Sequence, residues 1–127
     1  MSNFRIKKLK SELEEKGYFV AVLDGSECKN LHSFLDTMSK VFKFPDYYGE
    51  NINAFYDCIH DLGWISETNY ALIIHNKNFF LSKETLDEKK FTYNLLERIT
   101  QEWQNVPNYE GEDIYRNKAD FKVIFID

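Results

Sequence analysis

Cysteine, proline, glycine and long apolar runs are all scarce in this sequence. Its 127 residues include two cysteines, two prolines and five glycines. Two cysteines cannot build the disulfide framework of a small secreted domain, so we expect a reducing compartment. The longest apolar run, residues 18–23, is much too short to span a bilayer, and charges within residues 5–10 interrupt any secretion signal. The sequence therefore predicts a cytoplasmic protein with no membrane partner.

Positive charge is also in short supply. The chain has 16 Lys and Arg residues against 21 Asp and Glu residues, a formal net charge of -5. Binding to a phosphate backbone needs clustered Lys and Arg side chains that release counterions, so nucleic acid is not the expected partner. A basic protein fits this charge better.

Apolar and aromatic residues, by contrast, are plentiful. The chain is 43% apolar, and 17% of its residues are aromatic. This length and composition can bury one real core, so we expect a single domain over residues 1–127, with residues 1–16 as a helical extension. Many large rings must fill the core or lie at a contact surface.

Helical and strand-like segments alternate along the chain. Apolar residues at helical spacing predict helices over residues 3–16, 31–42, 52–62 and 86–104, the third ending at Gly63. Residues 18–24, 69–75 and 120–127 read as buried strands, and residues 106–119 as a polar loop. Strands separated by helices need crossover connections, so the fold class is α/β with a small three-stranded parallel sheet packed against several helices.

Negative charge is concentrated before and within the third predicted helix. Between Pro45 and Leu62 there are four acidic residues and no Lys or Arg, a formal charge of -4 against -5 for the whole chain. If the apolar residues of this helix face inward, the helical period places four polar residues on the solvent side: Glu50, Asn53, Asp57 and Asp61. This ridge repels itself slightly, and a basic partner could offset that cost.

A helix dipole can explain only part of this ridge. Glu50 near the helix start complements the dipole, but Asp57 and Asp61 lie toward the end where the dipole disfavours negative charge. A solvated face or a binding role must explain those two. Tyr47 and Tyr48 precede the ridge, and rings of this kind are enriched at interface hot spots, although we expect one of the two to pack inward.

The stretch FPDYYGENINAFYDCI, residues 44–59, resembles the signature of the barstar family. The shared features are the Pro, the acidic residue, Tyr-Tyr-Gly-Glu-Asn, and then Ala and Asp-Cys at fixed spacing. The order of elements around this stretch extends the resemblance over most of residues 18–127, while residues 1–16 and the loop near residues 109–118 look like additions.

The resemblance implies a non-catalytic ribonuclease inhibitor, or immunity protein. In barstar-like proteins this loop and helix enter the basic active-site cleft of a barnase-type toxin, in a 1:1 complex. Asp57 would then stand in for a substrate phosphate, with Glu50 and Asp61 adding charge. Tyr47 would pack near the toxin's catalytic histidine, Asn51 would offer polar contacts, and Gly49 would allow close backbone approach. A second acidic contact would come from the last helix, from Glu97 or Glu102.

Two departures from the family pattern keep another partner open. Asn53 stands where the family's best-known member has Asp, and Tyr56 where it has Trp. The lost charge weakens electrostatic steering while the ridge remains. The alternative is therefore a barstar-like interaction module whose partner is a different toxin or a protein that is not a nuclease.

Catalysis and cofactor binding have little support. The spacings of Cys28, His32, Cys58 and His60 fit no common zinc pattern, and Cys58 is better explained as a small buried residue. The sequence has no phosphate loop, nucleophile elbow or two-histidine metal motif. A small hydrolase with an acidic cleft is the third hypothesis. We expect no enzyme activity, metal or cofactor.

Overall fold

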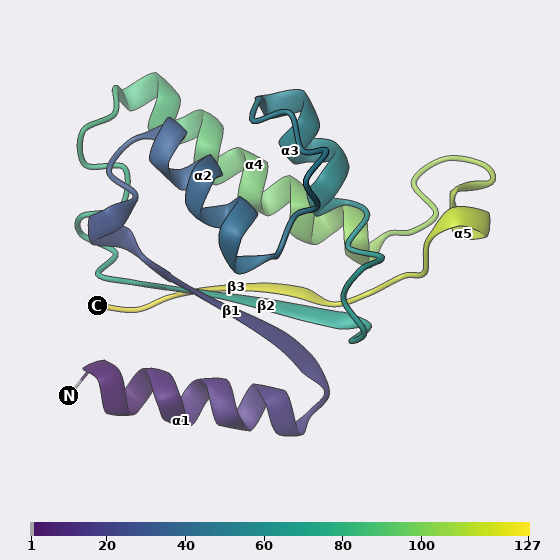
Figure 1. Cartoon of the computed structure of the whole chain (residues 1–127), viewed down its shortest axis with the longest axis horizontal. Helices are drawn as coiled ribbons and strands as arrows, with labels where there is room; N and C mark the ends of the chain where they lie inside the picture. The colour runs from purple at the N-terminus through teal and green to yellow at the C-terminus, as the bar shows by residue number, and fades with distance from the viewer. Residues whose placement is uncertain (1) are drawn as a thin grey trace.

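A computed structural model describes residues 2–127, and its elements follow the predicted order (Figure 1). The helices are α1 (Ser2–Glu15), α2 (Leu31–Val41), α3 (Ile52–Ile59), α4 (Leu86–Gln104) and α5 (Glu112–Tyr115), with a 3-10 turn η1 (Gly25–Glu27). The strands are β1 (Tyr18–Asp24), β2 (Asn69–His75) and β3 (Phe121–Phe125). No helix among these residues combines the length and apolar composition that a membrane crossing requires.

The three strands form one parallel sheet in the order β1-β2-β3, which confirms the predicted fold class. Tyr70 on the central strand pairs with Phe19 on one side and Phe121 on the other. The central strand is buried along most of its length, as predicted. The prediction that all three strands are buried was wrong for β1 and β3. Both are edge strands and remain partly open to solvent.

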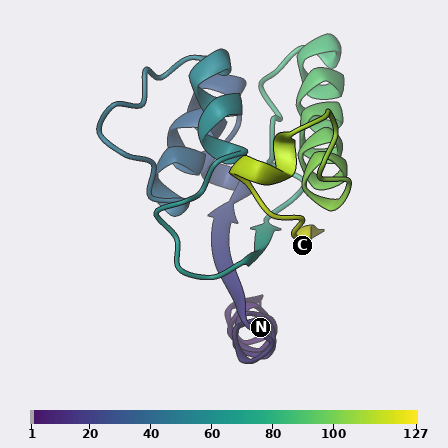
Figure 2. The same ribbon diagram turned by 90° about the vertical axis from the view of Figure 1, so that its right-hand side faces the viewer.

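Helix α1 covers one face of the sheet, while α2, α3 and α4 cover the other (Figures 1 and 2). Ile6 and Leu13 of α1 are buried against Val20, Ala71 and Ile73 of the sheet. Their spacing of seven residues puts both side chains on one helical face. The chain then turns at Gly17, whose positive φ of 91° favours glycine.

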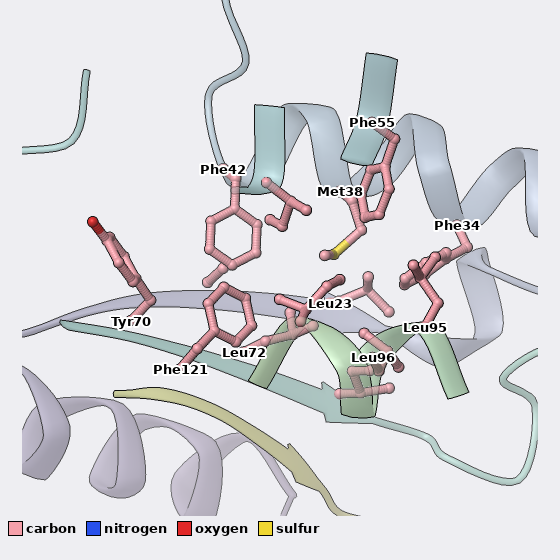
Figure 3. Packing of buried hydrophobic residues seen from close by; sticks show 14 of the residues in the cluster. Leu23, Phe34, Met38, Phe42, Phe55, Tyr70, Leu72, Leu95, Leu96 and Phe121 are labelled. Atoms are coloured by element: carbon pink, nitrogen blue, oxygen red, sulfur yellow. The ribbon is translucent and has the colours of Figure 1, made fainter. Parts of the chain in front are cut away.

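The larger core fills the space between the sheet and the three helices on its other face (Figure 3). Phe34 and Met38 of α2, Phe55 of α3, Leu95 of α4 and Phe121 of β3 meet there. Full burial of one such side chain contributes roughly 1.5–3 kcal/mol relative to exposure. This packing fixes the position of α3 against α4, and therefore the position of the candidate site.

Helix α3 ends earlier than its apolar pattern predicts. The helix stops at Ile59, His60 is its C-cap, and Leu62 has a positive φ of 54°. Leu62 is nevertheless fully buried, so its contact with the core comes from the turn and not from another helical turn. Spacing alone could not distinguish these two ways of burying the same side chain.

The segment over residues 106–119 is more ordered than a polar loop. It contains the short helix α5, and an ion pair joins Arg116 Nε to Glu112 Oε2 at 2.9 Å. Both side chains are largely buried, at 11% and 8% exposure. A buried charge needs a partner, so this pair holds the segment in one conformation.

Candidate functional site

The loop before α3 is shaped by Asn51, the N-cap of that helix. Asn51 Oδ1 accepts a hydrogen bond of 2.8 Å from the Ala54 backbone N–H, and its Nδ2 donates to Gly49 O at 3.3 Å. Side-chain caps of this kind satisfy a backbone donor that the helix leaves unpaired. The Asn51 side chain thus has a structural role in addition to its predicted contact with a partner.

The two tyrosines of the loop point in different directions. Tyr47 is 74% exposed, whereas Tyr48 is partly buried with its ring centroid 5.0 Å from that of Phe44. Tyr48 is therefore the inward-packing ring of the pair. Gly49 is exposed between Tyr48 and Glu50, although its carbonyl accepts the bond from Asn51 Nδ2. The loop presents Tyr47 and Gly49 to solvent beside the acidic residues.

The polar residues of the predicted ridge all face solvent. Asn53 and Asp57 lie on α3 itself, Glu50 precedes the helix with a positive φ of 55°, and Asp61 follows it. The ridge therefore consists of two helical positions flanked by two turn positions. Asp61 Oδ1 accepts a hydrogen bond from the Gly63 backbone N–H at 3.1 Å. Asp57 is exposed and forms no ion pair with any residue in the range 2–127, so its charge is available to a partner.

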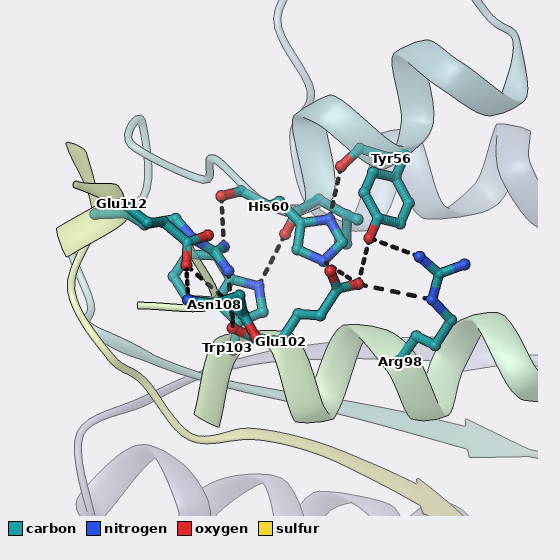
Figure 4. A network of polar contacts seen from close by, with 9 residues as sticks. Tyr56, His60, Arg98, Glu102, Trp103, Asn108 and Glu112 are labelled. Atoms are coloured by element: carbon teal, nitrogen blue, oxygen red, sulfur yellow. Dashed lines mark hydrogen bonds and ion pairs between the residues drawn. The ribbon is translucent and has the colours of Figure 1, made fainter. Parts of the chain in front are cut away.

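The structure separates the two glutamates proposed on the last helix. Glu102 reaches from α4 toward α3, where its Oε1 accepts a hydrogen bond from the Tyr56 hydroxyl and lies 3.8 Å from Arg98 Nε (Figure 4). Glu97 is exposed and accepts only a long bond of 3.4 Å from Gln101 within its own helix. Five residues of helix rotate the side chain by about 140°, so Glu97 points away from the face that carries Glu102.

A hollow of about 250 Å³ lies between α3, α4 and residues 106–118 (the 106–118 segment). Asp57 and Glu102 share its lining with Tyr56, His60, Tyr109 and Arg116. The structure thus brings Asp57 and Glu102 to one depression, with two carboxylates near its surface. These are acceptor groups, which suit a ligand that carries charged hydrogen-bond donors.

His60 occupies the inner wall of this hollow (Figure 4). Its Nδ1 donates a hydrogen bond of 2.8 Å to Tyr56 O, and its Nε2 lies 3.6 Å from Glu102 Oε1. Burial lowers the pKa of His60, even though Tyr56 O and Glu102 act in the opposite direction. This shift favours the neutral imidazole with its proton on Nδ1, so Nε2 has no hydrogen to donate to Glu102 and lacks a hydrogen-bond partner in the described structure.

Tyr56, one of the two departures from the family pattern, lines the hollow and contacts Glu102 and Arg98 of α4. Its hydroxyl donates to Glu102 and accepts a bond of 3.2 Å from Arg98 Nη2, while the Arg98 guanidinium lies 5.5 Å from the ring centroid. Glu102 is thus partly neutralised within the chain. Its negative charge is less available to a partner than that of Asp57.

Several residues of the site carried no prediction. Tyr109, Glu112 and Arg116 of the 106–118 segment line part of the hollow, and Arg98 on α4 donates a hydrogen bond to the hydroxyl of Tyr56, another lining residue. The spacing of four residues between Glu112 and Arg116 could have predicted their ion pair, because such pairs meet on one helical face. Nothing in the spacing indicated that this pair would lie beside Asp57.

Thiols and metal ligands do not gather at this site. Cys28 and Cys58 are both buried and unpaired in the described structure, and burial raises the pKa of each thiol. Within residues 2–127, no three side chains of His, Cys, Asp or Glu are grouped so that they could hold a metal ion. The candidate site is a surface of exposed acceptors.

Comparison with known proteins places the fold and this surface in context. The family model described as Barstar (barnase inhibitor) matches residues 18–124, which includes the whole path from β1 into β3 and leaves α1 outside. A Bacillus subtilis (strain 168) protein named "Putative ribonuclease inhibitor YrdF" is 33% identical over 58 residues. That alignment spans 46% of this chain and 60% of the relative, less than two thirds of its length. Because the family model covers most of the chain, this protein belongs to the barstar (barnase inhibitor) family.

Proposed function

We propose that this chain inhibits a barnase-type ribonuclease toxin by placing Asp57 in the enzyme's basic active-site cleft, in a 1:1 complex. It acts by binding and not by catalysis, as an immunity protein inside the cell that makes the toxin. Membership in the barnase inhibitor family supports a role of this kind. The single observation that carries the proposal is the exposure of Asp57 with no cationic partner in the described chain.

The chemistry of Asp57 suits phosphate mimicry. A carboxylate accepts short, charge-assisted and often bidentate hydrogen bonds from Arg, as a phosphate does. In a cleft that excludes water, such contacts are stronger than on an open surface. Asp57 is held on a helix whose inner face is anchored by Phe55 and Ile59, both fully buried, so its position is set before binding.

The neighbouring residues add contacts of different kinds. Glu50 and Asp61 add negative charge on either side of Asp57, and Asn53 adds a neutral polar group. Tyr47 supplies an exposed ring, and the exposed Gly49 leaves the backbone accessible. Glu102 lies at the same hollow, so we propose it and not Glu97 as the acidic contact from α4.

An inhibition assay with charge variants tests this proposal. The chain is titrated against a panel of purified barnase-type ribonucleases, barnase included, and cleavage of RNA is followed. Asp57→Asn removes the charge and keeps the shape, so we expect Kd for the inhibited enzyme to rise by about 30-fold or more. That factor corresponds to a hot spot of at least about 2 kcal/mol, a range to which the barnase–barstar pair itself contributes.

The matched control for this experiment is Glu12→Gln. Glu12 is exposed on α1, across the sheet from α3, so the loss of its charge changes the net charge equally without touching the site. Equal inhibition by the wild-type chain and the Asp57→Asn variant would refute the assignment of Asp57.

A second candidate function is a barstar-like module with a different protein partner. Two observations favour it: Asn53 carries no charge, and Glu102 is partly neutralised by Arg98. A weaker acidic surface suits a less basic partner. In that case no ribonuclease of the panel is inhibited, while affinity capture with the wild-type chain recovers a protein that Asp57→Asn fails to capture.

A further inference from the structure

The 106–118 segment exposes large apolar side chains beside the candidate site. Tyr109 is 62% exposed, Ile114 79% and Tyr115 82%. Ile114 and Tyr115 lie in the short helix α5, which sits at the ends of α3 and α4 (Figures 1 and 2). Exposed groups of this size cost free energy in a protein that stays alone in water, and their clustering marks interaction surfaces.

The segment is held firmly, so these side chains are presented in fixed positions. Arg116 Nη1 donates to His60 O at 2.8 Å and its Nη2 donates to Glu102 O at 2.9 Å, in addition to the Nε bond with Glu112. Its guanidinium lies 4.2 Å from the Trp103 ring centroid. Anchoring of this kind removes ordering costs that a flexible loop would incur on binding.

The same segment is continuous with the surface that carries Asp57. Tyr109 lines the hollow of about 250 Å³ that also contains Asp57. Tyr115 lines a second hollow, of about 200 Å³, together with Asp61, and Arg116 lines both. A partner seated over Asp57 and Asp61 would therefore meet the 106–118 segment at its edge.

The charge of the segment indicates which kind of partner it suits. Glu110 and Asp113 are exposed, whereas the charge of Arg116 is cancelled by Glu112, which leaves Lys118 as the exposed cation of the segment. A cationic protein complements this balance, as it complements Asp57. A second copy of this acidic chain, or a polyanion such as RNA, would be repelled by it.

We propose that the 106–118 segment is a second contact element for the ribonuclease, with Ile114 and Tyr115 as its apolar anchors at the rim of the enzyme's cleft. This inference rests on the proposed function and extends it. Because the segment lies outside the acidic motif of residues 44–59, it determines which ribonuclease of the class is bound most tightly. The acidic motif binds in the enzyme's cleft, and the 106–118 segment contacts the enzyme surface next to that cleft.

A double variant tests this inference in the full-length chain. Ile114→Ala/Tyr115→Ala is titrated against the ribonuclease that the wild-type chain inhibits, and we expect Kd to rise at least tenfold. Both side chains are about four-fifths exposed, so their loss should leave the thermal unfolding midpoint within a few degrees of wild type. Phe4→Ala is the matched control, since Phe4 is 74% exposed on α1, and its Kd should stay within twofold.

The outcomes separate this inference from the proposed function. If Asp57→Asn weakens inhibition while the double variant binds as tightly as wild type, the segment is not a contact element and the proposed function stands. If the wild-type chain inhibits no ribonuclease of the panel, both are overturned. If light scattering shows that the double variant abolishes self-association without changing Kd, the apolar side chains serve a second copy, and the inference is wrong.

Discussion

Glu102 and Asp57 carry negative charges that the rest of the chain neutralises to different extents. The Tyr56 hydroxyl donates a hydrogen bond to Glu102 and Arg98 lies beside it, so the charge of Glu102 is shared within the chain. Asp57, one residue after Tyr56, has no such partner in the described structure. A charge without a partner in the chain costs little free energy while water solvates it. It contributes most to binding when a cationic cleft replaces that water.

The same cluster predicts how stability responds to mild acid. Burial lowers the pKa of His60 in the folded chain below the value of about 6.5 expected when unfolded. As the pH falls through that value, the unfolded chain binds the proton more readily than the folded chain, so the free energy of unfolding decreases.

We therefore expect denaturant unfolding of the wild-type chain to show lower stability at pH 5.5 than at pH 7.5. His60→Gln keeps a hydrogen-bond donor but does not titrate, so its stability should change less over the same interval. Equal pH dependence in the two proteins would show that His60 is not the group responsible.

Among the elements, α3 and the 106–118 segment are joined through side-chain contacts to backbone. Arg116 bonds the carbonyl of His60 at the C-cap of α3 and the carbonyl of Glu102 near the end of α4. One guanidinium thus ties three elements together, which a Lys could not do with the same geometry. The segment is a structural part of the site.

Loss of this guanidinium should be costly. Arg116→Ala leaves the carboxylate of Glu112 buried without its cation, and we expect the free energy of unfolding to fall by about 3–5 kcal/mol. Denaturant titration measures this loss. Glu112→Gln combined with Arg116→Met removes the stranded charge and should recover part of it; a double variant as unstable as Arg116→Ala alone would contradict the account.

At the scale of the whole molecule, the sheet separates the extension from the candidate site. Helix α1 packs on one face of the sheet, and α3 with Asp57 lies above the other (Figures 1 and 2). The family match begins at residue 18, so α1 lies outside it. We propose that residues 1–127 form one domain in which α1 contributes stability and not partner contacts.

A core substitution in α1 tests this division. Leu13 is buried against the sheet, and Leu13→Ala should lower the free energy of unfolding by about 2–5 kcal/mol. Ribonuclease inhibition measured well below the unfolding temperature should be unchanged, because α3 rests on the other face. A loss of inhibition in a folded Leu13→Ala variant would mean that α1 takes part in binding.

Local sequence pattern was enough to predict most elements and the outward direction of Asp57. The alternation of helical and strand-like segments indicated a parallel sheet, and the apolar residues Phe55 and Ile59 placed Asp57 on the opposite face of α3. These predictions succeed because the helical period relates residues only a few positions apart. The same period misjudged the end of α3, where Leu62 reaches the core from a turn.

The choice between Glu97 and Glu102, and the closeness of the 106–118 segment to Asp57, depended on tertiary packing. Both involve contacts between elements tens of residues apart, such as Tyr56 with Glu102 and His60 with Arg116. Which partner a side chain meets across such a sequence separation depends on how the helices pack against the sheet. The apolar periodicity within one element carries no information about that packing. The acidic motif could therefore be recognised from the sequence alone, whereas the residues that surround it were determined by the tertiary structure.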